Sequence, residues 1–498
     1  MYLIDFCAIA CKPQTPKQLF MNLTFTKMKA LAAGALLLSH CTYAQINTPS
    51  GVTKPFATNT SYAYGIMPTN LPSGGTYGAS GDAATAYTAW KTKFVQDCSG
   101  GSKRVLYDDN SSTVSEGIAY GMLLAAYAAD QATFNGLYKF YKDNMNANKV
   151  MNWKYSSCTS RSGDNGATDA ELDAAMALLV AEYQWPAATS PYDYKTEAIN
   201  LIGNIRLHEM DASTHQTLNG DNWSFNANCR NPSYFSPAYY REFSKAETGQ
   251  SSFWNSAVTT TQSFLLTNRN STTGLVSNWA DQNAAANSCN GNNEYGWDAC
   301  RNPWRMGVDV LWNGAATATT ASNICLKIAA WSNGYGARLK GPLAQNAANP
   351  GVGSYKSGAF ASYALAVMGS SSTYQSHLNT CYTNIVGIGS GEAYFGNTLR
   401  VVNLFVLSGN FWQPDVTVGI SETQEESFRT YPNPFTNSVT VEGLSAATNY
   451  IITDIAGRVL QSGSTMGVIE TPFSAGVYSL AVQTNSGWTK AVKMIKVD

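Results

Sequence analysis

Glu-Gly-Ile-Ala-Tyr-Gly-Met-Leu-Leu-Ala-Ala-Tyr-Ala-Ala, residues 116–129, indicates the fold most clearly, because its apolar side chains recur at helical spacing. The same spacing recurs in Asp169–Tyr183, Thr196–Glu209, Ser252–Leu266, Trp304–Trp312, Ala321–Trp331, Gly358–Met368 and Thr398–Leu407. With less regular stretches, these segments predict roughly eleven helices between about residues 80 and 412. No strand pattern competes there. Sequential helical hairpins predict an all-α toroid of paired helices, whose long loops gather at one end and form a groove.

The pattern changes after Trp412. Residues 413–427 are polar and acidic, as in a linker, and from Ser427 onward short β runs alternate with turns. These runs are Val439–Val441, Tyr450–Thr453, Val459–Gln461, Val477–Gln483 and Ala491–Val497. A segment of this length and pattern predicts a small β-sandwich at residues 428–498.

The composition is that of a globular protein, with 44% hydrophobic and 13% charged residues. The formal net charge is −1, so no basic field is available for nucleic acid or an anionic membrane. The 28 Tyr and 12 Trp, combined with few charges, suit a neutral hydroxylated ligand such as a sugar. The same rings would also suit a large core, and composition alone leaves both interpretations open.

The N-terminal region has the features of an export signal. Met28 and Lys29 begin a short basic region, residues 30–38 are apolar, and Thr42 to Ala44 offer a small-residue cleavage site. We therefore expect residues 1–44 to be an N-terminal extension plus a signal peptide, with translation starting at Met28 and cleavage after Ala44. The apolar run is too short to span a bilayer, and no other stretch approaches a transmembrane helix.

Seven cysteines lie beyond residue 44, namely Cys98, Cys158, Cys229, Cys289, Cys300, Cys325 and Cys381. Export permits disulfides, and the odd number leaves at least one thiol free. Cys289 and Cys300 flank a Gly/Asn-rich loop, so a disulfide between them would close that loop. No Cys-x-x-Cys pair occurs, which argues against a zinc site.

Carboxylates are the remaining candidates for catalysis. The sequence has no Gly-x-Ser-x-Gly motif, no P-loop and no zincin motif, and it contains only 4 His. We therefore expect neither a metal ion nor a cofactor.

Three acidic residues each have a structural and a catalytic interpretation. Glu116 has capping-box spacing from Thr113, yet the small residues at 117, 119 and 121 leave room for a ligand. Asp169 lies in the first turn of a predicted helix, where neighbours with capping-box spacing also occur. Asp298 suits a helix N-cap paired with Arg301 one turn later. Taken singly, none of the three is decisive.

Together these residues lie in motifs that resemble family 8 of the glycoside hydrolases, over about residues 60–412. The motifs follow the family's order: Ser115-Glu-Gly, Tyr120-Gly-Met, Val150-Met-Asn-Trp-Lys, Ala167-Thr-Asp-Ala-Glu-Leu-Asp, Asn231-Pro-Ser-Tyr-Phe, Trp297-Asp-Ala-Cys-Arg, Tyr394-Phe-Gly-Asn-Thr-Leu-Arg and Leu407-Ser-Gly-Asn. The resemblance implies an (α/α)6 barrel at residues 45–412, an open groove and inversion at the anomeric carbon.

The resemblance also implies roles for individual residues. Glu116 would be the general acid, Asp298 the general base, and Asp169 would lie beneath the distorted sugar at the cleavage point. An aspartate at position 298 is typical of the subgroup similar to cellulases. The residues that match substrate-binding positions are Trp153 and Tyr394 for ring stacking, Tyr234 and Arg301 for lining or orienting, and Trp297, where many relatives have Tyr.

Inversion requires one protonated and one ionised carboxyl group, roughly 6.5–9.5 Å apart. A helix start stabilises the Glu116 anion and lowers the pKa of this side chain, whereas a general acid needs a raised pKa. We expect the neighbouring Asp169 anion to supply the upward shift.

The C-terminal segment resembles the sorting domain of the Bacteroidetes type IX secretion pathway. The matching motifs are Thr430-Tyr-Pro-Asn-Pro-Phe, Thr453-Asp-Ile-Ala-Gly-Arg, Gly476-Val-Tyr and Lys490-Ala-Val-Lys. The resemblance implies passage through the periplasm to the cell surface or medium, with the secretion machinery as partner. A sugar-binding module is the alternative, and the few aromatic residues argue against it.

The main hypothesis is therefore a secreted, monomeric endo-β-1,4-glucanase that acts on a β-glucan polysaccharide. Xylan, lichenan and chitosan are alternative substrates for the same mechanism, although a chitosan groove should carry extra acidic residues that a net charge of −1 does not indicate. A non-catalytic glycan-binding surface protein is the alternative from another class.

Overall fold

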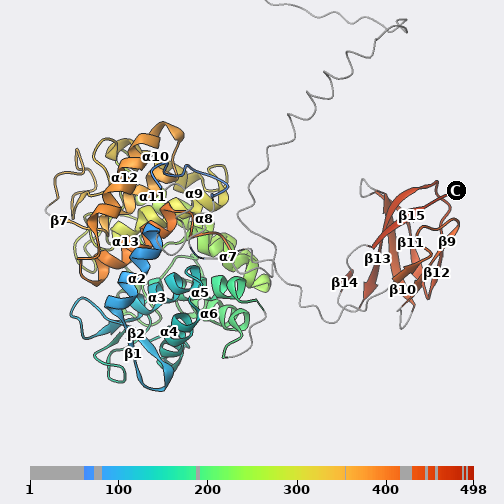
Figure 1. Ribbon diagram of the computed structural model, residues 1–498, viewed down its shortest axis with the longest axis horizontal. Coiled ribbons are helices and arrows are strands. Elements are labelled where there is room, and N and C mark those ends of the chain that lie inside the picture. Colours follow the sequence, from blue (N-terminus) through green and yellow to red (C-terminus); the bar gives the residue numbers. More distant parts are fainter. Residues whose placement is uncertain are drawn as a thin grey trace, which may run out of the picture. The chain divides into compact units, whose positions relative to one another are not determined.

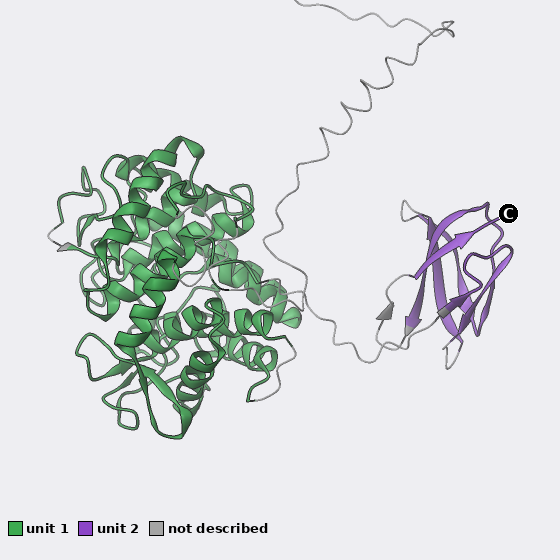
Figure 2. Ribbon diagram, viewed as in Figure 1, with its two compact units in different colours: residues 1–416 green, residues 417–498 purple. Residues whose placement is uncertain are grey.

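The computed structural model describes residues 56, 61–71, 81–186, 191–353, 355–414, 429–442, 447–454, 458–484, 487–488 and 492–498. The predicted export signal lies outside these residues, and so do residues 415–427 of the predicted linker. The chain divides into two compact units, residues 1–416 and residues 417–498 (Figure 2).

Helices make up most of the first unit (Figure 1). Its described residues contain twelve α-helices: α2 Asp82–Phe94, α3 Ser115–Tyr127, α4 Gln131–Asp143, α5 Thr168–Gln184, α6 Tyr194–His208, α7 Pro237–Ala246, α8 Ser251–Asn268, α9 Asn302–Asn313, α10 Thr319–Ser332, α11 Tyr363–Met368, α12 Gln375–Ile388 and α13 Tyr394–Leu407. Every segment for which the sequence predicted a helix contains one. The predicted helix over residues 358–368 is shorter, because a 3₁₀ turn at Phe360–Ser362 precedes α11.

Burial separates these helices into two alternating sets. α3, α5, α9, α11 and α13 are buried along almost their whole length, including the charged side chains that α5 and α9 carry. The helices between them bury one face only. In α6 that face consists of Tyr194, Ala198, Leu201, Ile202 and Ile205, at helical spacing. With α7, the buried helices form an inner ring surrounded by six outer helices, which confirms the predicted (α/α)6 barrel.

The close approach of α9 and α11 depends on a residue without a side chain at their point of contact. A Cβ atom at Gly307 of α9 would lie 2.5 Å from the carbonyl oxygen of Leu365 in α11. Only glycine leaves room for this contact between the two backbones.

Short strands in the first unit brace the loops at the helix ends. They are β1 Val95–Asp97, β2 Lys103–Val105, β3 Thr113–Val114, β4 Lys154–Tyr155, β5 Arg161–Gly163, β6 Lys340–Gly341 and β7 Tyr355–Lys356. The sheet β3–β4–β5 matters for function, because it leads directly into α3. The backbone N–H of Ser115 donates to the carbonyl of Trp153 at 2.8 Å, so these two motifs lie side by side.

In the described part of the first unit, two disulfides tie loops together, Cys98–Cys158 and Cys229–Cys289. The Cys289–Cys300 bond that the sequence allowed does not form. Backbone hydrogen bonds between Arg230 and Ala280 bring the loop of Cys229 to the loop of Cys289. Cys300 instead points inward, where its buried thiol donates to the carbonyl of Trp297 at 3.0 Å.

The second unit contains two antiparallel sheets. One has the order β11–β10–β13–β14 with β15 also paired to β13, and the other has the order β12–β9–β8. Their strands are β8 Arg429–Tyr431, β9 Ser438–Glu442, β10 Thr448–Asp454, β11 Val459–Thr465, β12 Val468–Glu470, β13 Gly476–Thr484, β14 Gly487–Trp488 and β15 Val492–Lys496. A separate core that includes Val439, Ile452, Ile469, Leu480 and Met494 lies between the sheets, which confirms the predicted β-sandwich.

None of the helices in the described part of the chain has the length and hydrophobicity that crossing a membrane requires.

Candidate active site

A pocket of about 440 Å³ lies where the N-terminal ends of three inner helices, α3, α9 and α13, come together. Its lining residues are Tyr107, Asp108, Glu116, Trp297, Asp298, Arg301, Ser357, Glu392, Ala393, Phe395 and Gly396. The pocket therefore contains two of the three predicted catalytic carboxylates, Glu116 and Asp298.

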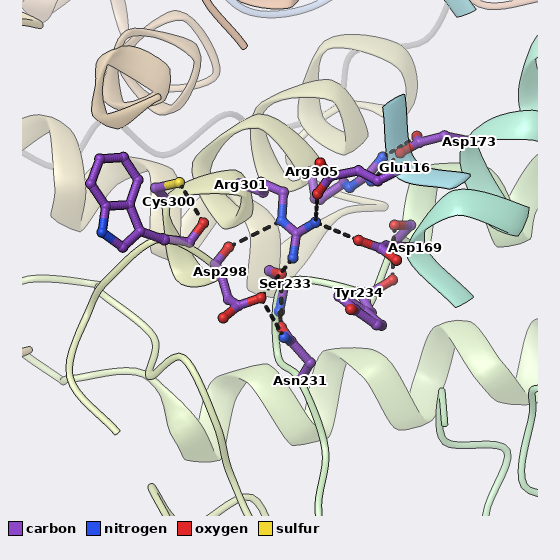
Figure 3. A network of polar contacts seen from close by, with 12 residues as sticks. Glu116, Asp169, Asp173, Asn231, Ser233, Tyr234, Asp298, Cys300, Arg301 and Arg305 are labelled. Atoms are coloured by element: carbon purple, nitrogen blue, oxygen red, sulfur yellow. Dashed lines mark hydrogen bonds and ion pairs between the residues drawn. The ribbon is translucent and has the colours of Figure 1, made fainter. Parts of the chain in front are cut away.

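Arg301 joins all three predicted carboxylates (Figure 3). Its Nη1 donates to Glu116 Oε2 at 2.9 Å and to Asp169 Oδ2 at 2.5 Å, and its Nη2 donates to Asp298 Oδ1 at 3.0 Å. The Arg301 side chain is only 2% exposed. One buried cation thus faces three carboxyl groups, and this excess of negative charge favours a proton on one of them.

Glu116 is the carboxyl group best suited to hold that proton. Burial raises the pKa of Glu116 to about 8, against the opposing attraction of Arg301, and the Asp169 carboxylate adds to the rise. The expectation that Asp169 supplies the main upward shift was therefore only partly right, because burial is the larger cause. Tyr394 Oη donates to Glu116 Oε1 at 2.9 Å and fixes the second oxygen.

The helix-capping interpretation does not hold for Glu116. The N-cap of α3 is Val114, which makes no side-chain cap. Thr113 Oγ1 donates instead to the carbonyl of Val105 at 2.9 Å. Glu116 therefore has no capping partner and faces the pocket. The pairing of Asp298 with Arg301, by contrast, is present as predicted.

A second ion pair fixes the contact between Asp169 on α5 and Arg301 just before α9. Four residues after each of them along the chain, Arg305 of α9 donates to both oxygens of Asp173 of α5, at 2.6 and 2.7 Å. A bidentate pair of this kind has one geometry. It holds α5 and α9 in a single register, and that register brings Asp169 to Arg301.

The aromatic residues proposed for substrate binding occupy different environments. Trp297 is 40% exposed, with its ring 5.0 Å from that of Phe360 and 6.1 Å from that of Phe395. Tyr394 is fully buried against Glu116, and the ring of Tyr234 lies 5.2 Å beneath the Arg301 guanidinium. Trp297 is therefore accessible from the pocket, whereas Tyr394 mainly contacts Glu116.

Trp153 lies in a separate group of aromatic side chains. Its half-buried ring is 6.3 Å from that of Trp223, which in turn is 5.5 Å from that of Phe225. Trp223 Nε1 donates to the carbonyl of Gly166, just before Asp169. The pair Trp153 and Trp223 thus borders the segment that leads into the acidic centre.

Several residues at the site escaped sequence-based reasoning. Tyr107 and Glu392 line the pocket but stand in no recognisable chemical motif, and Phe395 lies in the motif that begins at Tyr394 without a role assigned to it. Trp223 lies in a loop rich in aromatic residues, and this is the only feature of the sequence that could have suggested a place at the site for Trp223. Asn231 begins a motif of the family, yet nothing in that motif predicts its hydrogen bond to Asp298 at 2.9 Å.

Behind Asp169, a pair of buried carboxyl groups has no role in this pocket. Glu171 accepts from Tyr141 Oη and from the N–H of Met151, both at 3.2 Å. Neither oxygen of Glu209 has a hydrogen-bond partner among the described residues. Burial raises the pKa of Glu209 well above its usual range, and the nearby Glu171 raises it further. The folded protein therefore holds a proton on this pair more tightly than the unfolded chain does.

Glu209→Gln is expected to stabilise the protein at alkaline pH. The folded state binds this proton more tightly than the unfolded chain, so wild type loses stability as pH rises above about 4.3, the unfolded value, toward the raised folded value. Glutamine has the same shape and does not titrate. The advantage of the variant should grow by about 1.4 kcal/mol per pH unit in that window. Urea unfolding at several pH values measures it, and a difference that stays constant with pH would contradict the assignment.

No group of three or more His, Cys, Asp or Glu residues in the described part of the chain is arranged to hold a metal ion.

Comparison with known proteins adds an independent line of evidence. The model of glycosyl hydrolases family 8 matches residues 69–408, and that of the secretion system C-terminal sorting domain matches residues 429–497. Over 367 residues the chain is 34% identical to Endoglucanase 2 of Ruminiclostridium josui, covering 72% of this chain and 77% of that protein. It is 31% identical to Endoglucanase A of Acetivibrio thermocellus over 385 residues, 74% of this chain and 76% of that protein.

Solved structures share the same architecture. The apo structure of a beta-1,3-1,4-glucanase from Paenibacillus sp. X4 superposes with a TM-score of 0.66 at 27% identity, covering 73% of this chain and all of that one (100%). A reducing end xylose-releasing exo-oligoxylanase superposes with a TM-score of 0.60 at 20% identity, covering 70% of this chain and 97% of that one. The second likeness concerns the fold alone.

Proposed function

This chain belongs to family 8 of the glycosyl hydrolases, and on that basis we propose that it cleaves internal β-1,4-glucosidic bonds of cellulose-type glucans with inversion. Glu116 is the general acid, Asp298 is the general base, and Asp169 holds the sugar at the cleavage point. The observation that carries the proposal is the pocket in which Arg301 joins these three carboxyl groups, one of them with a pKa of about 8.

In the proposed reaction, Glu116 gives its proton to the glycosidic oxygen as the bond to the anomeric carbon breaks. A water molecule on the opposite face of the ring forms the new carbon–oxygen bond, and Asp298 takes a proton from that water. A pKa of about 8 supports the acid role, because most of Glu116 is then protonated at neutral pH. The Arg301 guanidinium stands between the two carboxyl groups and keeps them from direct contact, which an inverting pair requires.

The relatives support glucan as the substrate. Proteins named endoglucanases are 31–34% identical to this chain over most of its length. A protein named an exo-oligoxylanase is 25% identical over 218 residues, 42% of this chain. The test is the release of reducing sugar from carboxymethyl cellulose, lichenan, xylan and chitosan by the purified protein. Fastest hydrolysis of β-1,4-glucan, with an early drop in viscosity, supports the proposal. A clear preference for xylan or chitosan would replace the substrate, and no hydrolysis at all would favour a glycan-binding protein.

Residues 429–497 form a secretion system C-terminal sorting domain. We propose that it directs the enzyme through the periplasm to the cell surface or medium, and that the catalytic domain, residues 45–412, works without it as a monomer. Truncation after Trp412 should leave specific activity on soluble glucan unchanged and retain the enzyme inside the native host's cells. Export of the truncated enzyme would refute the sorting role.

A further inference from the structure

The loop before α7 contributes a fixed hydrogen-bond donor to the proposed general base. Asn231 is 1% exposed, and its Nδ2 donates to Asp298 Oδ1 at 2.9 Å. Its own Oδ1 accepts from the N–H of Ser233 at 3.0 Å and from Ser233 Oγ at 2.8 Å. Because both donors of Ser233 bind this oxygen, the amide cannot turn over, and its N–H groups must face Asp298.

The two oxygens of Asp298 are treated differently. Oδ1 accepts from Asn231 on one side and from Arg301 Nη2, at 3.0 Å, on the other. Among the described residues, no hydrogen bond reaches Oδ2 (Figure 3). The side chain is 30% exposed and lines the pocket. Two donors on Oδ1 fix the rotation of the carboxylate, and Oδ2 is left to receive a proton from water.

We propose that Asn231 is a positioning residue for the general base: it aims Oδ2 of Asp298 at the attacking water. This inference rests on the proposed hydrolase function. It also assigns a purpose to the motif Asn231-Pro-Ser-Tyr-Phe, in which Ser233 fixes the asparagine that fixes the base.

Asn231→Asp is the sharpest variant. A carboxylate oxygen can still accept both hydrogen bonds from Ser233, so only the atom that faces Asp298 changes, from donor to acceptor. We expect kcat on soluble glucan to fall on the order of 10²-fold, with KM within about twofold of wild type because the change leaves ground-state binding intact. The acid limb of the kcat/KM profile should move to higher pH, since Asp298 must now ionise beside another carboxyl group.

Asn278→Ala controls for a purely structural effect on the same loop. Asn278 Oδ1 accepts from the backbone N–H groups of Gly296, Asp298 and Ala299, so its loss should lower thermal stability without moving the acid limb of the kcat/KM profile.

If Asn231→Asp fails to fold, Ser233→Ala tests the positioning role of Asn231. It removes one hydrogen bond that orients the Asn231 amide and should lower kcat by about 5-fold.

An unchanged acid limb in folded Asn231→Asp would overturn the positioning role, as would wild-type kcat in Ser233→Ala where only that variant folds. Either result leaves the proposed function intact as long as wild type hydrolyses glucan. Absence of hydrolysis by wild type would instead overturn the proposed function and this inference together.

Discussion

Glu116→Gln is expected to lower kcat on soluble β-1,4-glucan by about 10²–10⁴-fold, the usual contribution of a general acid. Glutamine has nearly the same shape and carries no proton that it can transfer to the leaving oxygen. Its amide oxygen can still accept from Arg301 or Tyr394, the two groups that hold Glu116 now, so the fold should survive. Initial rates, with circular dichroism as the folding check, measure the effect. A folded variant with wild-type turnover would remove Glu116 from the mechanism.

The pH dependence of wild type follows from the same residue. In the proposed mechanism Glu116 acts only in its protonated form, and its pKa is about 8 because burial and Asp169 outweigh Arg301. The alkaline limb of kcat/KM should therefore fall as pH rises through about this value.

Asp298→Asn should have an effect of similar size, about 10²–10⁴-fold on kcat. Asparagine keeps the volume of the side chain but cannot take a proton from the attacking water. Substrate binding should change little, because the variant alters a group that acts in the transition state.

Asp143→Asn is the matched control for Asp298→Asn. Asp143 ends the outer helix α4, where it pairs with Lys139 and is 53% exposed. The same chemical change at this position should leave the rate at the wild-type level. A rate loss at position 143 comparable to that at position 298 would indicate a general effect of lost negative charge and not a lost base.

Sequence alone predicted the fold well, because its signals are local. The apolar stretch at residues 116–129 and its counterparts follow a helical period that tertiary contacts did not override. The sequence also identified Glu116, Asp169 and Asp298 as a group, because their motifs occur together in family 8 of the glycoside hydrolases. The structure brings them to one guanidinium, that of Arg301.

What the sequence could not predict depends on contacts between distant segments. The pairing of Cys229 with Cys289 follows from two loops that meet through Arg230 and Ala280, and no spacing rule contains that information. The dominant cause of the raised pKa of Glu116 is burial, a property of the assembled barrel. Asn231 is 67 residues from Asp298 along the chain, so their hydrogen bond has no local signature.

The stereochemistry of the first product tests the central claim, the inverting pair Glu116 and Asp298, most directly. Proton NMR can follow the anomeric signals as a cello-oligosaccharide is cleaved, at times shorter than mutarotation. Direct attack by water on the face opposite the β-linked leaving group predicts that the α anomer appears first. Initial appearance of the β anomer would mean a double displacement through a covalent intermediate, and would contradict the assignment of Asp298 as a base that activates water.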